Sequence, residues 1–118
     1  MKLKVFVVVA ATAFIMFATS QNGFASDNNP GYNLIKTSGC LACHAVDQNK
    51  VGPSYKIIAE TNKKLYGKDA IKHIEKSIEN GVKGKYKNLG ITAAMPPYGY
   101  LGKQKIETIA KWIMSLAK

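Results

Sequence analysis

The sequence predicts an all-α domain of four to five short helices. Apolar residues recur at helical spacings of three and four in several segments, and loops rich in glycine and proline separate those segments. No strand-like alternation and no internal repeat occur. Residues 26–118, which follow a predicted export segment, number 93 of the 118 residues and fit one small domain with a modest apolar core.

The N-terminal segment has the layout of a secretory signal. Two lysines precede an apolar run at residues 5–18, and polar residues then lead to the small-x-small tripeptide at 23–25. An uncleaved membrane anchor is the alternative, but the apolar run is shorter than the roughly 20 residues that cross a bilayer. We therefore expect a signal peptide over residues 1–25, cleaved after Ala25, and a periplasmic location for the domain.

The first two helices are expected at residues 30–37 and 55–62. Pro30 is tolerated in a first helical turn, and Gly39 can end the first helix because glycine is favoured just beyond a helix C-terminus. The second helix is short and follows a loop that contains Pro53.

The third helix is expected at residues 69–80. Three isoleucines recur along it at spacings of three and four, Asp69 can cap its start, and Gly81 can close it. His73 falls off the apolar stripe, so we interpret it as a surface histidine rather than a metal ligand.

The last helix is expected at residues 103–117. Ile106, Ile109 and Ile113 lie on one side of it, and this apolar stripe predicts packing against the first helix.

Cys40, Cys43 and His44 form a Cys-x-x-Cys-His string. Two thiols at this spacing can each add to a haem vinyl group, while the adjacent histidine binds the iron. A redox dithiol, a structural zinc site and a plain disulfide are alternatives. A dithiol is typical of a βαβ context and zinc needs a second pair of ligands, yet the chain has no other cysteine and only one other histidine, His73. The string predicts one covalently attached haem c.

A haem that carries electrons needs a sixth iron ligand, and a thioether raises its reduction potential. Met114 lies inside the last predicted helix, where it is most simply a core residue. Met95 precedes Pro96 and Pro97, whose fixed φ angles restrict the loop. We expect Met95 to be the sixth ligand; the alternative is a proline turn with an incidental methionine.

Two further residues are candidates for the haem site. Pro53 has a carbonyl but no N–H, so it can accept a hydrogen bond from the ring nitrogen of His44 that does not bind iron, unless residues 51–54 form only an ordinary turn. Trp112 is large enough to reach a haem edge or the first helix. It can equally be a core aromatic with its N–H near the surface.

The charge of the exported part predicts acidic partners. Residues 26–118 contain 15 lysines, no arginine and 7 acidic residues, for a net charge of +8. Export argues against nucleic acid, and lysine suits loose, salt-sensitive encounters. We expect an acidic redox protein, such as a terminal oxidase or reductase, and transient contact with a membrane surface or membrane protein stays open. No coiled coil or large apolar face is evident, so a monomer is expected.

One set of lysines lies between residues 63 and 87 and either forms a docking face or is only a solvated surface. Its members are Lys63, Lys64, Lys68, Lys72, Lys76, Lys83, Lys85 and Lys87.

The chain resembles the short bacterial class I cytochromes c over nearly all of residues 30–118. Four motifs carry the resemblance: Gly39-Cys40-Leu41-Ala42-Cys43-His44-Ala45, Val51-Gly52-Pro53-Ser54-Tyr55, Met95-Pro96-Pro97 and Ala110-Lys111-Trp112-Ile113. It implies the small cytochrome c fold around one haem with an exposed edge, His44 and Met95 as axial ligands, thioether bonds to Cys40 and Cys43, and Pro53 as the carbonyl partner of His44. It also implies electron shuttling outside the cytoplasm.

The chain departs from the family pattern in three places. Tyr98 stands where an asparagine often follows the Met-Pro-Pro segment, and residues 81–90 form a longer loop than usual. Tyr86 stands where many members have a tryptophan that hydrogen-bonds a haem propionate. A phenol can take that role, and an exposed loop aromatic is the alternative.

These features favour a soluble electron carrier that is not an enzyme. A haem enzyme or gas-binding protein, such as a peroxidase, is the alternative, and it needs an open distal site for which only His73 offers an imidazole. A dedicated electron-donating subunit of one enzyme is intermediate between the two.

Overall fold

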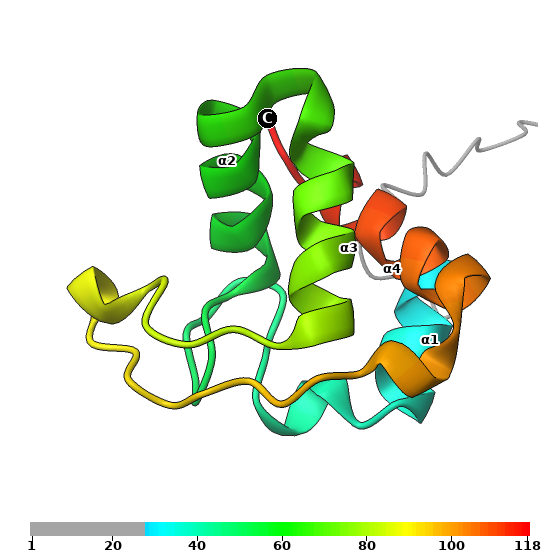
Figure 1. Cartoon of the computed structure of the whole chain (residues 1–118), viewed down its shortest axis with the longest axis horizontal. Coiled ribbons are helices and arrows are strands. Elements are labelled where there is room, and N and C mark those ends of the chain that lie inside the picture. Colours follow the sequence, from blue (N-terminus) through cyan, green and yellow to red (C-terminus); the bar gives the residue numbers. More distant parts are fainter. Residues whose placement is uncertain (1–27) are drawn as a thin grey trace, which may run out of the picture.

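A computed structural model describes residues 28–118, and the predicted signal peptide at residues 1–25 lies outside them. The described chain contains four α-helices: α1 (Pro30–Thr37), α2 (Tyr55–Tyr66), α3 (Ala70–Asn80) and α4 (Lys103–Ser115) (Figure 1). Single 3-10 turns occur at Cys40–Ala42, Gly67–Asp69, Lys87–Leu89 and Gly99–Leu101. No strand is present in this range, so the predicted all-α class is confirmed.

Helix α1 has the bounds that the sequence predicts. The side chain of Asn29 accepts hydrogen bonds from the backbone N–H groups of Gly31 and Tyr32, which are otherwise unpaired at a helix start. Pro30 occupies the first helical position, and Gly39 follows the end of the helix in a left-handed conformation. The cysteine-containing turn therefore begins directly after α1.

Helix α2 is one turn longer than the sequence predicts. Ser54 caps its start by accepting from the N–H of Ile57. The expected end at Asn62 is wrong because residues 63–66 are helix-compatible and the first glycine comes at Gly67.

The start of α3 also differs from the prediction. Asp69 precedes α3, but its side chain makes no capping bond. A capping side chain requires an extended backbone at the cap, and Asp69 instead ends the tight turn Gly67–Asp69, with φ −93° and ψ 3°.

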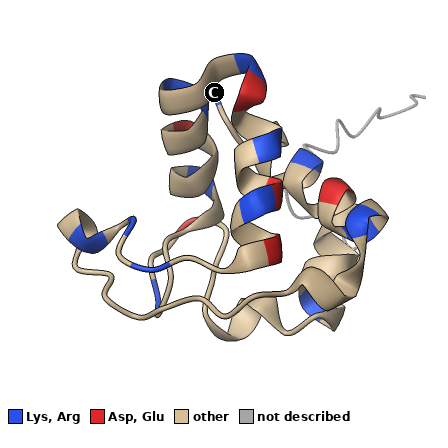
Figure 2. Ribbon diagram, in the orientation of Figure 1, with Lys and Arg blue, Asp and Glu red and all other residues tan. Residues whose placement is uncertain are grey.

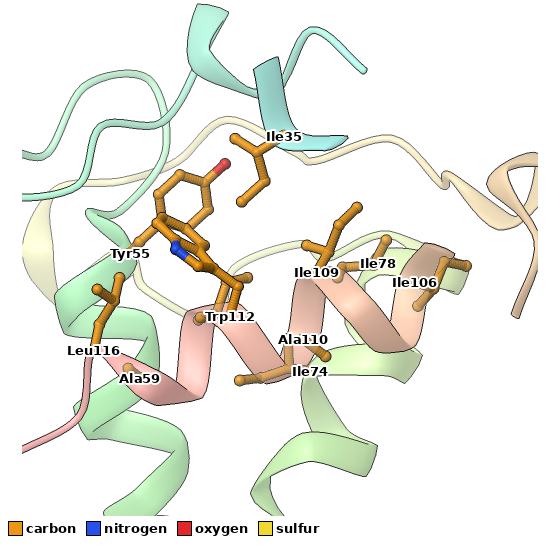
Figure 3. Close-up of a cluster of buried hydrophobic side chains, with 11 residues drawn as sticks. Ile35, Tyr55, Ala59, Ile74, Ile78, Ile106, Ile109, Ala110, Trp112 and Leu116 are labelled. Atoms are coloured by element: carbon orange, nitrogen blue, oxygen red, sulfur yellow. The ribbon is translucent and has the colours of Figure 1, made fainter. Parts of the chain in front are cut away.

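The helices enclose one apolar core. Helices α2 and α3 lie side by side, and α4 packs against both of them and against α1, so the predicted contact between first and last helices is confirmed (Figure 1). The core draws on all four helices and is centred on α4; its members are Ile35, Tyr55, Ala59, Ile74, Ile78, Ile106, Ile109, Ala110, Trp112, Ile113 and Leu116 (Figure 3). Within residues 28–118 no helix has the length and apolar content needed to span a bilayer.

Candidate functional site

One cleft brings together most of the predicted site residues. It encloses about 1110 Å³, including space open to solvent, and lies between the segment from Gly39 to Tyr55, helices α2 and α3, and the loop before α4. Six of the seven residues that the sequence predicts for the site line this cleft. They are Cys40, Cys43, His44, Pro53, Tyr86 and Met95.

His44 is buried and firmly oriented. Its Nδ1 lies 2.7 Å from the carbonyl oxygen of Pro53, so Nδ1 carries the donated proton and Nε2 is left with its lone pair. Burial lowers the pKa of His44, and the Pro53 carbonyl only partly opposes this effect. The ring is thereby held neutral, which is the form that binds a metal.

Gly52 supports the other side of the imidazole. A Cβ atom at this position would lie 2.5 Å from Cε1 and 2.8 Å from Nδ1 of His44, closer than van der Waals contact permits. The N–H of Gly52 donates to the carbonyl of Cys43 at 2.8 Å, which ties this loop to the cysteine turn. The absence of a side chain at Gly52 is therefore what allows the ring to lie against the loop.

The two cysteines stand on the turn that follows α1. The N–H groups of Cys43 and His44 both donate to the carbonyl of Cys40, at 3.2 and 3.0 Å, so the three residues form one tight turn. Cys43 is exposed and Cys40 is half-buried, and burial raises the pKa of the Cys40 thiol. The thiols are not joined in a disulfide.

Met95 is held by backbone pairing as well as by the prolines after it. Met95 and Val82 exchange two hydrogen bonds of 2.8 and 3.1 Å in an isolated antiparallel bridge. Gly81, at φ 78°, makes this approach possible, because a Cβ there would lie 2.5 Å from the Met95 carbonyl oxygen. The N–H of Tyr98 donates to Ile78 at 2.8 Å. The methionine loop is thus fastened to the end of α3 on both sides of the two prolines.

Tyr55 is a site residue that sequence reasoning missed. Its side chain is 3% exposed and lines the cleft, and its ring centroid lies 5.1 Å from that of His44. Its hydroxyl is buried beside the Cys40 thiol, and burial, with a smaller effect of Cys40, raises its pKa. Its position directly after the Gly-Pro-Ser segment was the one available signal.

Trp112 does not line the cleft. It lies behind Tyr55, whose ring meets the indole edge-on with centroids 5.3 Å apart (Figure 3). Trp112 also packs against Tyr32 of α1, with ring centroids 5.5 Å apart. The sequence left open whether Trp112 reaches a haem edge or the first helix, and the structure shows the contact with the first helix. The indole N–H is buried without a partner, so the expectation that it lies near the surface is wrong.

Tyr86 lines the cleft, whereas His73 does not. Tyr86 is 8% exposed and lines the cleft, so it is not an exposed loop aromatic, and burial raises its pKa to about 12. His73 lies outside the cleft and stacks on Tyr66, with ring centroids 3.5 Å apart. No imidazole other than that of His44 therefore faces the cleft.

The donor set fits a haem c and not the alternatives. The cleft is lined mainly by apolar side chains, and it combines two thiols, one oriented neutral imidazole and one thioether. Within residues 28–118 no group of three His, Cys, Asp or Glu side chains could hold a metal ion, so a zinc site lacks its ligands. The βαβ context of a redox dithiol is also absent from this range.

Comparison with known proteins agrees with the geometry. The cytochrome c family model matches residues 29–117. Cytochrome c-551 of Pseudomonas denitrificans is 35% identical over 88 residues, 73% of this chain and 96% of that protein. Cytochrome c-552 of Hydrogenobacter thermophilus is 32% identical over 117 residues, covering 98% of this chain and 99% of the relative.

A solved structure has the same fold. The crystal structure of wild-type Nitrosomonas europaea cytochrome c552 aligns with a TM-score of 0.61 and 30% identity, covering 71% of this chain and 96% of that one. The chain belongs to the cytochrome c family, whose members carry a covalently bound haem c and transfer electrons.

Proposed function

We propose that this cytochrome c is a one-electron carrier, not an enzyme, in which His44 and Met95 are the axial iron ligands and Cys40 and Cys43 form the thioether bonds. The observation that carries the proposal is that a thioether and a neutral imidazole, from segments about fifty residues apart, line the same apolar cleft. A carrier with both axial positions filled leaves no site for a substrate.

Bound haem c supplies an iron centre that alternates between Fe(II) and Fe(III), and a thioether ligand favours Fe(II). The chain's residues keep that centre from rearranging. Pro53 fixes the rotation of His44, and the bridge to Val82 fixes the backbone of Met95. The apolar lining excludes water, and a rigid, dry site needs little reorganisation when the charge changes.

Optical spectra of the mature holoprotein test this function against an open-site haem enzyme. We expect the weak near-infrared band of sulfur-to-iron coordination in the oxidised protein and no binding of carbon monoxide to the reduced protein. Five-coordinate iron, or rapid carbon monoxide binding, would instead support a gas-binding protein or a peroxidase.

The signal-like segment at residues 1–25 supports a periplasmic location, and the lysine excess supports an acidic redox protein as partner. Seven of the eight lysines that the sequence groups between residues 63 and 87 are exposed. They lie on α2, on the turn Gly67–Asp69, on α3 and on the loop after α3 (Figure 2). Lys85 is the exception and faces the cleft. The other seven, called the lysine face here, form the proposed docking surface.

Docking through the lysine face predicts a salt-sensitive reaction. Between low and physiological ionic strength, the bimolecular rate with an acidic redox protein should fall by about tenfold, because screening removes electrostatic steering. Stopped-flow mixing measures this rate, and a neutral small-molecule reductant serves as a salt-insensitive reference.

Two double variants, each of which removes two positive charges, test where the docking surface lies. Lys83→Gln with Lys87→Gln should lower the rate and flatten its salt dependence more than Lys103→Gln with Lys105→Gln at the start of α4, which lies away from that loop (Figure 1). Equal effects of the two pairs would show that total charge, and not this face, governs the encounter.

A further inference from the structure

A single cation lines the cleft in the described part of the chain. Among the described residues that line the cleft, Lys85 is the only lysine, and no aspartate or glutamate is present. Lys85 is half-buried, whereas its neighbours Lys83 and Lys87 on the same loop are exposed. Lys85 therefore faces the cleft, unlike the seven exposed lysines of the lysine face.

The ammonium group of Lys85 is surrounded by neutral groups. Its Nζ donates to Oδ1 of Asn62 at 3.2 Å and lies 5.4 and 5.8 Å from the ring centroids of Tyr66 and Tyr86. No acidic residue within 28–118 forms an ion pair with it. Burial lowers the pKa of Lys85, as expected for a cation that lacks a counter-ion. An anion in the cleft would remove this cost.

Asn62 contacts the side chains of both Lys85 and Tyr86. It is 1% exposed, and its Nδ2 donates to the carbonyl of Ile58 at 2.7 Å, which fixes the amide on α2. The same Nδ2 makes a long contact of 3.5 Å with the Tyr86 hydroxyl oxygen. That oxygen acts as acceptor toward Asn62, so the Tyr86 O–H proton remains available for another acceptor.

A haem presents the matching chemistry, because it carries two carboxylates as propionates on an otherwise apolar ring. A buried carboxylate is costly unless it is paired and hydrogen-bonded. We propose that Lys85 and Tyr86 bind one haem propionate, as counter-ion and hydrogen-bond donor, with Asn62 as the positioning residue for both. This inference rests on the haem site of the proposed function and assigns a role to Lys85 and Asn62.

The arrangement has a measurable consequence for electron transfer. A cation beside the haem, or a propionate whose charge it offsets, disfavours the ferric state, which carries one more positive charge than the ferrous state. Lys85 therefore raises the reduction potential. Lys87 is solvated, so salt and water screen its effect.

The test compares Lys85→Gln with Lys87→Gln in the holoprotein, because both variants remove one positive charge from the same loop. We expect Lys85→Gln to lower the equilibrium constant for reduction by about tenfold, equivalent to about 59 mV for one electron. Lys87→Gln should change it by less than about twofold. Lys85→Arg keeps the charge and should restore most of the loss, and Asn62→Leu should lower the constant in part.

A second readout reports on the propionate directly. In reduced protein made with haem labelled with ¹³C at the propionate carboxylates, the signal of one of the two carboxylates should move in Lys85→Gln and stay in place in Lys87→Gln. The proposal is overturned if neither carboxylate signal moves, or if the two glutamine variants shift the potential equally.

Failure of this inference is distinct from failure of the proposed function. The near-infrared sulfur band is measured on every variant. An unchanged band together with unmoved carboxylate signals rejects the role of Lys85 alone. A wild-type protein without that band rejects the axial ligation by Met95.

Discussion

Replacing Met95 by alanine should abolish the near-infrared sulfur band and lower the reduction potential by roughly 0.1–0.3 V, because the thioether that favours Fe(II) is lost. The same variant should bind carbon monoxide in the reduced state, since its sixth coordination position is then open. Spectroscopic redox titration and carbon monoxide difference spectra measure both effects on the purified holoprotein.

Met114→Ala is the matched control. Met114 is half-buried in α4 and packs against the apolar core, outside the cleft lining. Its loss should lower the free energy of unfolding by about 1–3 kcal/mol and leave the band and the potential unchanged. If Met95→Ala retained the band, another group would be the sixth ligand, and a band lost only in Met114→Ala would name it.

The second large effect is expected for Gly31→Ala, at the crossing of α1 and α4. A Cβ at Gly31 would collide with Cβ of Trp112 and lie 2.9 Å from the carbonyl oxygen of Thr108. The obstacles are a backbone oxygen and the first side-chain atom of a buried tryptophan, so the helices have to separate. Overpacking of this kind should lower the free energy of unfolding by about 2–3 kcal/mol, and the melting temperature by roughly 10–20 °C.

The sign of this effect distinguishes packing from helix propensity. In a helix, alanine is more stable than glycine by about 1 kcal/mol, so propensity alone predicts a more stable variant. Gly99→Ala provides the comparison, because its Cβ would lie 3.3 Å from the carbonyl of Glu79 at an exposed position. Thermal unfolding of both holoproteins, followed by circular dichroism, should show a much larger loss for Gly31→Ala; stabilisation would refute the close helix crossing.

Local signals predicted most of the secondary structure. The bounds of α1 follow from Pro30 and Gly39, which act on their own backbone neighbours, and the apolar stripe of α4 predicted its contact with α1. The prediction failed at the end of α2 and at the cap of α3. There the outcome depends on how two helices join through the turn Gly67–Asp69, and no single residue type determines it.

The candidate site divides in the same way. Cys40, Cys43 and His44 are close together in the sequence, so their motif can be recognised without knowledge of the fold. Pro53 and the two prolines after Met95 restrict the backbone, so the sequence also predicts rigid loops there. Tyr55, Asn62 and Gly81 carry no such signal. Their roles come from burial beside His44, from an amide held on α2, and from a close backbone approach to Met95.

Sequence alone determined the family, the cofactor chemistry and the four helices of this protein, because covalent attachment motifs and helical periodicity are local properties of the chain. Only the tertiary structure decided which side chains face the cleft. In that structure Trp112 lies behind Tyr55, outside the cleft lining, and Lys85 lines the cleft, unlike the exposed lysines. Both outcomes depend on burial, which arises when segments distant in sequence pack together and exclude water.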